Sequence, residues 1–218
     1  MASSEELFEA IEAGDVAGVR ELLADEPGLA SARDASGVSA LMRARYRLDL
    51  GLVEAIRSRA GDLDVFEAAS FGDLDRLTML LDEDPSLANT RSGDGFSALH
   101  LAAFFGKPEA TELLLARGAE VDGRGTGWRT GTALHSAASN SHTDVARLLL
   151  NADANPDARQ SHGFMPLHAA AMNGNADLAR LLLERGADRE ATNDDGRSAR
   201  DYASDGGDAD TIATLGGA

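Results

Sequence analysis

The sequence predicts an all-α solenoid, in which short helical modules stack along a single continuous domain. Three observations predict it: a recurring seven-residue segment, an alternation of alanine-rich and leucine-rich stretches, and a second, longer regularity in the N-terminal half. The segment begins at Ser97, returns at Thr132 and Met165, and is partly preserved at Ser198. A recurrence at about 33 residues is typical of stacked helical repeats rather than of one globule with a catalytic cleft.

Each full module is expected to contain two helices. The first follows the recurring Leu-His pair and is rich in alanine, which has high helix propensity and lets neighbouring helices approach closely. The second carries a leucine triplet three to four residues after apolar or small residues, so one face is apolar and packs on the next module. The triplets are Leu113-Leu114-Leu115, Leu148-Leu149-Leu150 and Leu181-Leu182-Leu183.

Residues that tolerate a left-handed backbone separate these helices. The expected turns between the two helices of a module lie at Gly72, Gly106, Ser141 and Gly174, and the second helix is expected to end at Gly118, Asp153 or Gly186. The polar connections at 122–131, 157–163 and 191–196 predict hairpin-like loops that project from the stack.

The recurring segment resembles the ankyrin repeat, whose signature is Thr-Pro-Leu-His-x-Ala and whose period is about 33 residues. Residues 165–170 read Met-Pro-Leu-His-Ala-Ala, and residues 186–188 supply the Gly-Ala-Asp that follows the leucines. The resemblance implies a noncatalytic module that binds another protein in its concave groove.

When the sequence is shifted against itself by one fixed number of residues, the first two modules align with the next two. The shift pairs Pro27 with Pro85 and Gly37 with Gly95. The shifted pairs place the modules at about 4–36, 37–64, 65–94, 95–129, 130–162 and 163–195, followed by a C-terminal cap at 196–215. The expected total is therefore about six helix pairs plus a capping remnant.

Two modules depart from the pattern. The stretch from Leu41 to Val65 is too short for a helix pair and a projecting loop. We therefore expect the hairpin to be missing there, with a local change of curvature near 58–66. In the cap, Arg200 replaces the usual leucine and Asp201 the histidine, which suits a module that faces water.

Composition excludes several classes of protein. The formal charge of −17 disfavours binding to nucleic acid or to anionic membranes. The chain has no cysteine, hence no disulfide or thiolate metal site. It shows no signal peptide and no apolar run of membrane-spanning length, so a cytoplasmic protein is expected.

The histidines do not predict a metal site or a catalytic set. His100, His135 and His168 occupy the same place in successive modules and so cannot converge on one ion, while His142 and His162 lack partners at ligand spacing. The resemblance implies that the repeated histidine forms hydrogen bonds at the start of the first helix. We found no motif of a hydrolase, a phosphate-binding loop or a metalloprotease. No enzyme activity, cofactor or metal is therefore predicted.

The resemblance also implies which side chains line the concave groove. In the middle modules these are aromatic, and an apolar strip of Tyr46, Phe71, Phe104 and Phe105 is typical of a recognition surface. The predicted contact residues are Tyr46, Arg47, Phe71, Phe104, Phe105, Trp128 and Met172. The alternative is that some rings pack under the projecting loops, a choice that also applies to Phe96 and Phe164.

Arginines gather beside this strip and leave two interpretations open. Arg43, Arg45 and Arg47 alternate along one predicted helix, and further arginines lie on or beside loops at positions 33, 91, 124, 129 and 159. They can balance internal charge or dock a carboxylate of a partner.

The preferred hypothesis is a noncatalytic protein–protein interaction module. Its partner is of unknown identity, and the chain itself is a monomer or a weak homodimer. One alternative is a structural protein that forms a homodimer through the same apolar strip. A less favoured one is a binder of anionic small molecules at the arginines of the second module.

Overall fold

The computed structural model describes residues 2–126 and 130–216, and in these residues it contains fourteen α-helices and three short 3-10 helices. Contacts cluster into two compact units. The first comprises Met1–Glu67 with Ser92–Asp94, and the second comprises Ala68–Arg91 with Gly95–Ala218. The all-α repeat architecture is confirmed, while the single continuous domain and its module boundaries stay a prediction.

The first unit contains two helix pairs. They are α1 (Ser4–Ala13) with α2 (Val16–Asp25), and α3 (Ala40–Tyr46) with α4 (Leu50–Arg57), joined by the 3-10 helix η1 (Pro27–Ser31). Apolar side chains such as Leu7, Leu41 and Ile56 are fully buried between them. An isolated antiparallel bridge between Arg33 and Ser39 closes a hairpin-like loop.

Helix α5 (Val65–Phe71) begins in the first unit and ends in the second. The elements that follow it are α6 (Leu74–Glu83), η2 (Pro85–Asn89), α7 (Ala98–Phe104), α8 (Pro108–Ala116), α9 (Ala133–Ser139), α10 (Thr143–Asn151), η3 (Ser161–Gly163), α11 (Pro166–Met172), α12 (Ala176–Glu184), α13 (Ala199–Gly206) and α14 (Ala209–Gly216). The order α1–α2–η1 recurs as α5–α6–η2, with the two prolines Pro27 and Pro85 at the start of the 3-10 helices. This recurrence accounts for the longer regularity.

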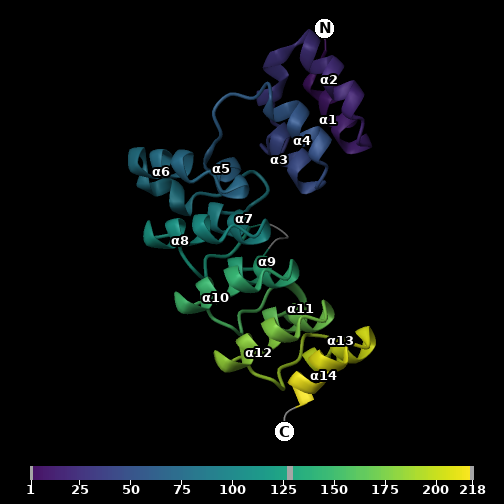
Figure 1. The fold of residues 1–218 in the computed structure, drawn as a ribbon, viewed down its shortest axis with the longest axis vertical. Helices are drawn as coiled ribbons and strands as arrows, with labels where there is room; N and C mark the ends of the chain where they lie inside the picture. Colours follow the sequence, from purple (N-terminus) through teal and green to yellow (C-terminus); the bar gives the residue numbers. More distant parts are fainter. Residues whose placement is uncertain (1, 127–129, 217–218) are drawn as a thin grey trace. The chain divides into compact units, whose positions relative to one another are not determined.

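In the second unit the helices form two rows. Figure 1 shows α7, α9, α11 and α13 following one another, with α8, α10, α12 and α14 beside them. The alanines of the first row, such as Ala102, Ala137 and Ala170, are fully buried, so the helix backbones approach closely. One leucine from each triplet, for example Leu114 or Leu149, is fully buried in the second row.

The backbone turns where the sequence predicts. Gly106, Ser141 and Gly174 have φ of 60°, 59° and 63°, and Asp153 has φ of 63° at the end of α10. The connection from α4 to α5 spans only residues 58–64, without a hairpin.

The C-terminal cap differs from the expected remnant, because α13 and α14 form a further complete helix pair. Arg200 and Asp201 are exposed there. The Asp201 carboxylate replaces the usual histidine in the local hydrogen bonds, since it accepts from the Ser198 backbone N–H at 2.8 Å. This bond keeps the helix start intact while presenting a polar surface.

Leu48 is the exception among the turns. It has φ of 57°, a left-handed conformation that the equivalent turns give to glycine or serine, and 72% of it is exposed. Replacing Leu48 with Gly is expected to raise the free energy of unfolding of the first unit by about 0.5–1 kcal/mol, because the strain exceeds the entropy that glycine adds to the unfolded chain. Urea unfolding checks this. The exposed Leu50, changed to Ala, is the control, and an equal or lower stability of Leu48→Gly would contradict the expectation.

Candidate functional site

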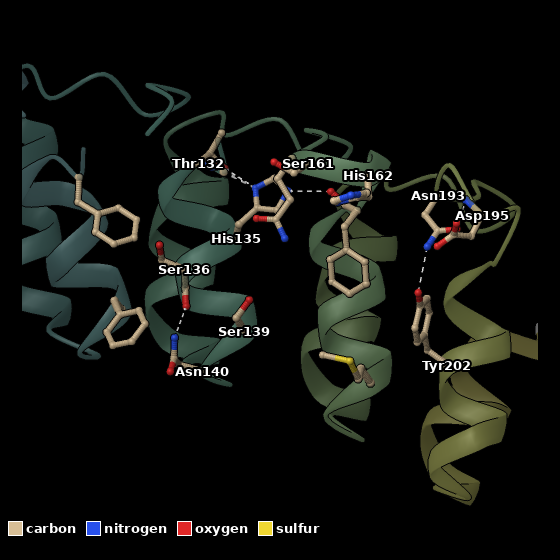
Figure 2. Close-up of a pocket in the computed structure, with 16 residues that line it drawn as sticks. Thr132, His135, Ser136, Ser139, Asn140, Ser161, His162, Asn193, Asp195 and Tyr202 are labelled. Atoms are coloured by element: carbon tan, nitrogen blue, oxygen red, sulfur yellow. Dashed lines mark hydrogen bonds between the residues drawn. The ribbon is translucent and has the colours of Figure 1, made fainter. Parts of the chain in front are cut away.

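A groove of about 530 Å³ crosses the second unit over the first helices of its modules. Its lining residues come from α7, α9, α11 and α13 and from the loops that precede these four helices, Phe96 before α7 among them. Figure 2 shows Ser136 and Ser139 on α9, with Ser161 and His162 on the loop beyond it and Tyr202 on α13. A volume of this size lies within the range of ligand sites in proteins.

The modules contribute side chains of very different size to the groove. Phe104 on α7 and Met172 on α11 share a repeat position with Ser139 on α9, and all three line the groove. Met172 is 53% exposed, whereas Phe104 is half-buried and packs edge-to-face on Phe105 with ring centroids 4.9 Å apart. The groove is therefore bounded by bulky apolar groups on both sides of α9.

At its C-terminal end the groove is lined by an aromatic pair. Phe164 and Tyr202 meet edge-to-face with ring centroids 5.5 Å apart. Asn193 donates from its amide to the Tyr202 hydroxyl at 2.9 Å, which fixes the phenol beneath the loop that carries Asn193 and Asp195 (Figure 2). The Arg197 guanidinium lies 4.0 Å from the centre of the same ring and is paired with Asp205.

The repeated histidines support the groove from below. In each case Nδ1 accepts from the backbone N–H three residues earlier, and Nε2–H donates to a carbonyl in the next loop. His135, for example, accepts from Thr132 at 3.1 Å and donates to Phe164 at 3.2 Å, and His100 and His168 reach Gly131 and Arg197 in the same way. Because a carbonyl can only accept, each ring is the neutral Nε2–H tautomer. The predicted local role is confirmed, and the bond to the next loop extends it.

Burial keeps these rings neutral. It lowers the pKa of His100 and of His135 to about 4 and also lowers the pKa of His168, and the hydrogen bonds to the next carbonyl offset only part of this effect. Nδ1 accepts a hydrogen bond from a backbone N–H. A proton on Nδ1 would point at this N–H and repel it, which also disfavours the charged ring.

The loops above the groove are tied to one another. The Asn155 N–H donates to the Asp122 carboxylate at 3.0 Å, and the Asp188 N–H donates to Asp157 at 2.9 Å, one module further on. Arg91 donates to the Arg124 carbonyl at 3.2 Å, and Arg124 in turn donates to the Arg159 carbonyl. These hydrogen bonds join the described parts of successive loops to one another.

Comparison with known proteins assigns the repeat. A family model described as "Ankyrin repeats (3 copies)" matches residues 65–160, and another described as "Ankyrin repeats (many copies)" matches residues 149–203. Together they cover more than half of the chain. The chain belongs to the ankyrin-repeat family.

This ankyrin-repeat protein matches parts of larger proteins. It is 43% identical over 100 residues to E3 ubiquitin-protein ligase XB3 of Oryza sativa subsp. japonica, an alignment that covers 45% of this chain and 22% of the relative. It is 41% identical over 96 residues to protein phosphatase 1 regulatory subunit 27 of Mus musculus (44% and 60%), and 39% over 92 residues to a putative ankyrin repeat-containing protein of Treponema pallidum (42% and 30%). The alignments thus span less than two thirds of each relative.

The predicted contact residues of this ankyrin-repeat protein fall into separate groups. Tyr46 and Arg47 belong to the first unit, and Phe71, Phe104, Phe105 and Met172 belong to the second. Phe104 and Met172 line the groove. Phe71 and Phe105 are half-buried and are not part of its lining, and Trp128 lies outside the described residues.

Several groove residues were missed in the sequence. Tyr202, Asn193 and Asp195 lie in the degraded C-terminal repeat, and His162 and Gln160 lie in a loop. The repeat alignment contained a signal for Tyr202, because it occupies the position of Ser136 and Ala169 on a groove-facing helix. No sequence pattern marks the loop residues, whose places depend on contacts between successive loops.

The arginines of the second module are engaged within the first unit. Arg43 pairs with Asp34 at 2.5 Å, Arg47 pairs with Glu12 at 3.6 Å, and burial lowers the pKa of the partly buried Arg45. Arg33 likewise pairs with Asp64 at 2.7 Å. These contacts favour internal charge balance over an anion-binding cluster.

Residues 2–126 and 130–216 contain neither a cluster of metal ligands nor a membrane-spanning helix. No three or more histidine, aspartate or glutamate side chains there come together as metal ligands. None of the helices described is both long and apolar enough to cross a bilayer.

Proposed function

We propose that this protein is a noncatalytic binding module that holds a partner protein in the groove over α7, α9, α11 and α13. The observation that carries the proposal is the groove itself: aromatic and thioether groups lie beside hydroxyl and amide groups under loops that hydrogen bonds join to one another. Desolvation of Phe104, Phe164 and Met172 supplies affinity, and the joined loops keep the entropy cost of binding low. The cytoplasmic location stays a prediction.

A groove variant tests this function. Phe104→Ser combined with Met172→Ser is expected to lose capture of the partner from a lysate of the source organism, because both apolar contacts are removed. Phe104 is half-buried, so a loss of about 1 kcal/mol of stability is also expected, and circular dichroism must show that the variant stays folded. Met79→Ser, which removes a thioether that is 61% exposed on α6, is the matched control. Equal capture by the folded groove variant and the control would contradict the proposal.

Self-association through the same surface is the second candidate, and it is favoured only by the exposed Met172 and the aromatic lining. Size-exclusion chromatography with light scattering separates the two functions. A stable dimer that Phe104→Ser with Met172→Ser converts to a monomer would assign the groove to a homodimer. A monomer in both forms keeps the groove available for another protein.

A further inference from the structure

The groove contains a recess over α9. Ser139 on α9 occupies the repeat position that Phe104 has on α7 and Met172 has on α11, and all three line the groove. Ser136, one turn earlier, also lines the groove, whereas Leu101 at the same repeat position of α7 is fully buried. The Asn140 amide donates to the Ser136 carbonyl at 2.9 Å, so it is engaged along its own helix. We call this recess, bounded by Phe104, Ser136, Ser139 and Met172, the α9 notch. Its size and mixed lining suit one large apolar side chain.

The opposite end of the groove attracts a cation. Asp195 is exposed, and it contributes the carboxylate found among the groove-lining residues in the described chain. Its backbone N–H donates to Asn193 at 3.1 Å, and within the described residues no hydrogen bond or ion pair engages its carboxylate. Asp194 adjoins it in sequence, and the nearby Arg197 is already paired with Asp205. The chain as a whole has a formal charge of −17, which steers cationic segments towards it.

The spacing of the helices relates these two features. The α9 notch lies on α9, and Asp195 lies in the loop that precedes α13, with α11 between these two helices. Packed helices lie about 8–10 Å apart, so the two sites are about 16–20 Å apart across the helices. They are also offset along the helices, because Ser139 ends α9 whereas Asp195 precedes the start of α13. An extended chain advances about 3.3 Å per residue, so it needs at least about five or six residues to join them.

We propose that the partner enters the groove as an extended segment with one tryptophan, phenylalanine, leucine or methionine in the α9 notch. A lysine or arginine at least about five residues away meets Asp195. This inference rests on the proposed function and specifies the chemistry of the partner.

Selection from a random dodecapeptide library displayed on phage tests the pattern with the full chain as bait at about 0.15 M salt. The expected result is enrichment of peptides that pair a large apolar residue with lysine or arginine at the stated spacing. Enrichment of peptides that lack either group, of acidic peptides, or of none would overturn the proposal.

Variants then locate the two contacts, with the best selected peptide as a fluorescent probe. Ser139→Trp fills the α9 notch and is expected to raise the dissociation constant about tenfold or more. Asp195→Asn is expected to raise it about threefold and to reduce its dependence on salt. Asn151→Trp introduces the same ring at an exposed position on the outer helix α10, and it should leave binding unchanged.

Equal binding by Ser139→Trp and Asn151→Trp would overturn the apolar contact in the α9 notch. An unchanged dissociation constant for Asp195→Asn would overturn the contact between Asp195 and a cation. If Ser139→Trp does not fold, Ser136→Leu fills the same notch, because Ser136 also lines the groove. Failure of this peptide pattern is distinguishable from failure of the proposed function, which is capture of a partner protein in the groove. A partner captured by the wild type and lost in Phe104→Ser with Met172→Ser keeps the groove function even if the selected peptides lack the pattern.

Discussion

Lowering the pH from 7 to 5 is expected to reduce the stability of the second unit by about 4 kcal/mol, through His100 and His135. Burial lowers the pKa of each of these rings to about 4 in the folded protein, against an ordinary value of 6.5. The unfolded chain therefore takes up protons in this interval while the folded rings stay neutral. Their contribution is full above about pH 6.5 and is lost as the pH falls towards 4.

The first unit should respond with the opposite sign at Glu67. Burial, together with the neighbouring Asp64, raises the pKa of this carboxyl, which accepts from the Ser39 hydroxyl at 2.6 Å. Its contribution to stability is present below the ordinary pKa of 4.5 and is lost as the pH rises through the higher folded value. Acidification from pH 7 to 5 thus strengthens the Glu67 contribution while it weakens the histidine contribution.

Urea unfolding at pH 7, 6 and 5, followed by circular dichroism, measures the expected trend. His135→Gln should remove about half of the loss, because glutamine does not titrate. Changing the exposed Asn151 on α10 to Gln should leave the trend as in the wild type. The same pH dependence in the wild type and in His135→Gln would show that the buried ring does not control acid stability.

Replacing His135 with Ala is expected to lower the free energy of unfolding at pH 7 by about 2–4 kcal/mol. The change leaves the buried Thr132 N–H and the Phe164 carbonyl without the ring that now joins them, at 3.1 Å and 3.2 Å, and it creates a cavity. Because Phe164 lines the groove, the binding of any groove ligand should weaken as well. His100→Ala should act in the same direction, since His100 donates to Gly131 at 3.0 Å.

Thermal or urea unfolding measures this loss, and His162→Ala is the matched control. His162 lies on a loop with its side chain exposed, so its removal should change stability by no more than about 0.5 kcal/mol. Equal unfolding midpoints for His135→Ala and His162→Ala would show that the hydrogen bonds between the helix start and the next loop contribute little.

Only some of the residues that line the candidate site could be predicted from the sequence. Phe104 and Met172 were found because groove-facing positions recur once per module. Tyr202 and Asp195 were missed because both lie in the degraded C-terminal repeat. For the arginines of the second module the sequence left charge balance and carboxylate docking open, and the pairing of Arg43 with Asp34 and of Arg47 with Glu12 favours charge balance.

The repeating architecture of this protein follows from its amino-acid sequence alone. A helix pair is a local structure, and its alanines, leucines, turn residues and capping groups lie within one period of about 33 residues. The packing of the modules was needed to establish which repeated side chains line a common groove, which carboxylate stays available at its end, and that the C-terminal cap is a complete helix pair. These features depend on contacts between successive modules, and the composition of a single module does not specify them.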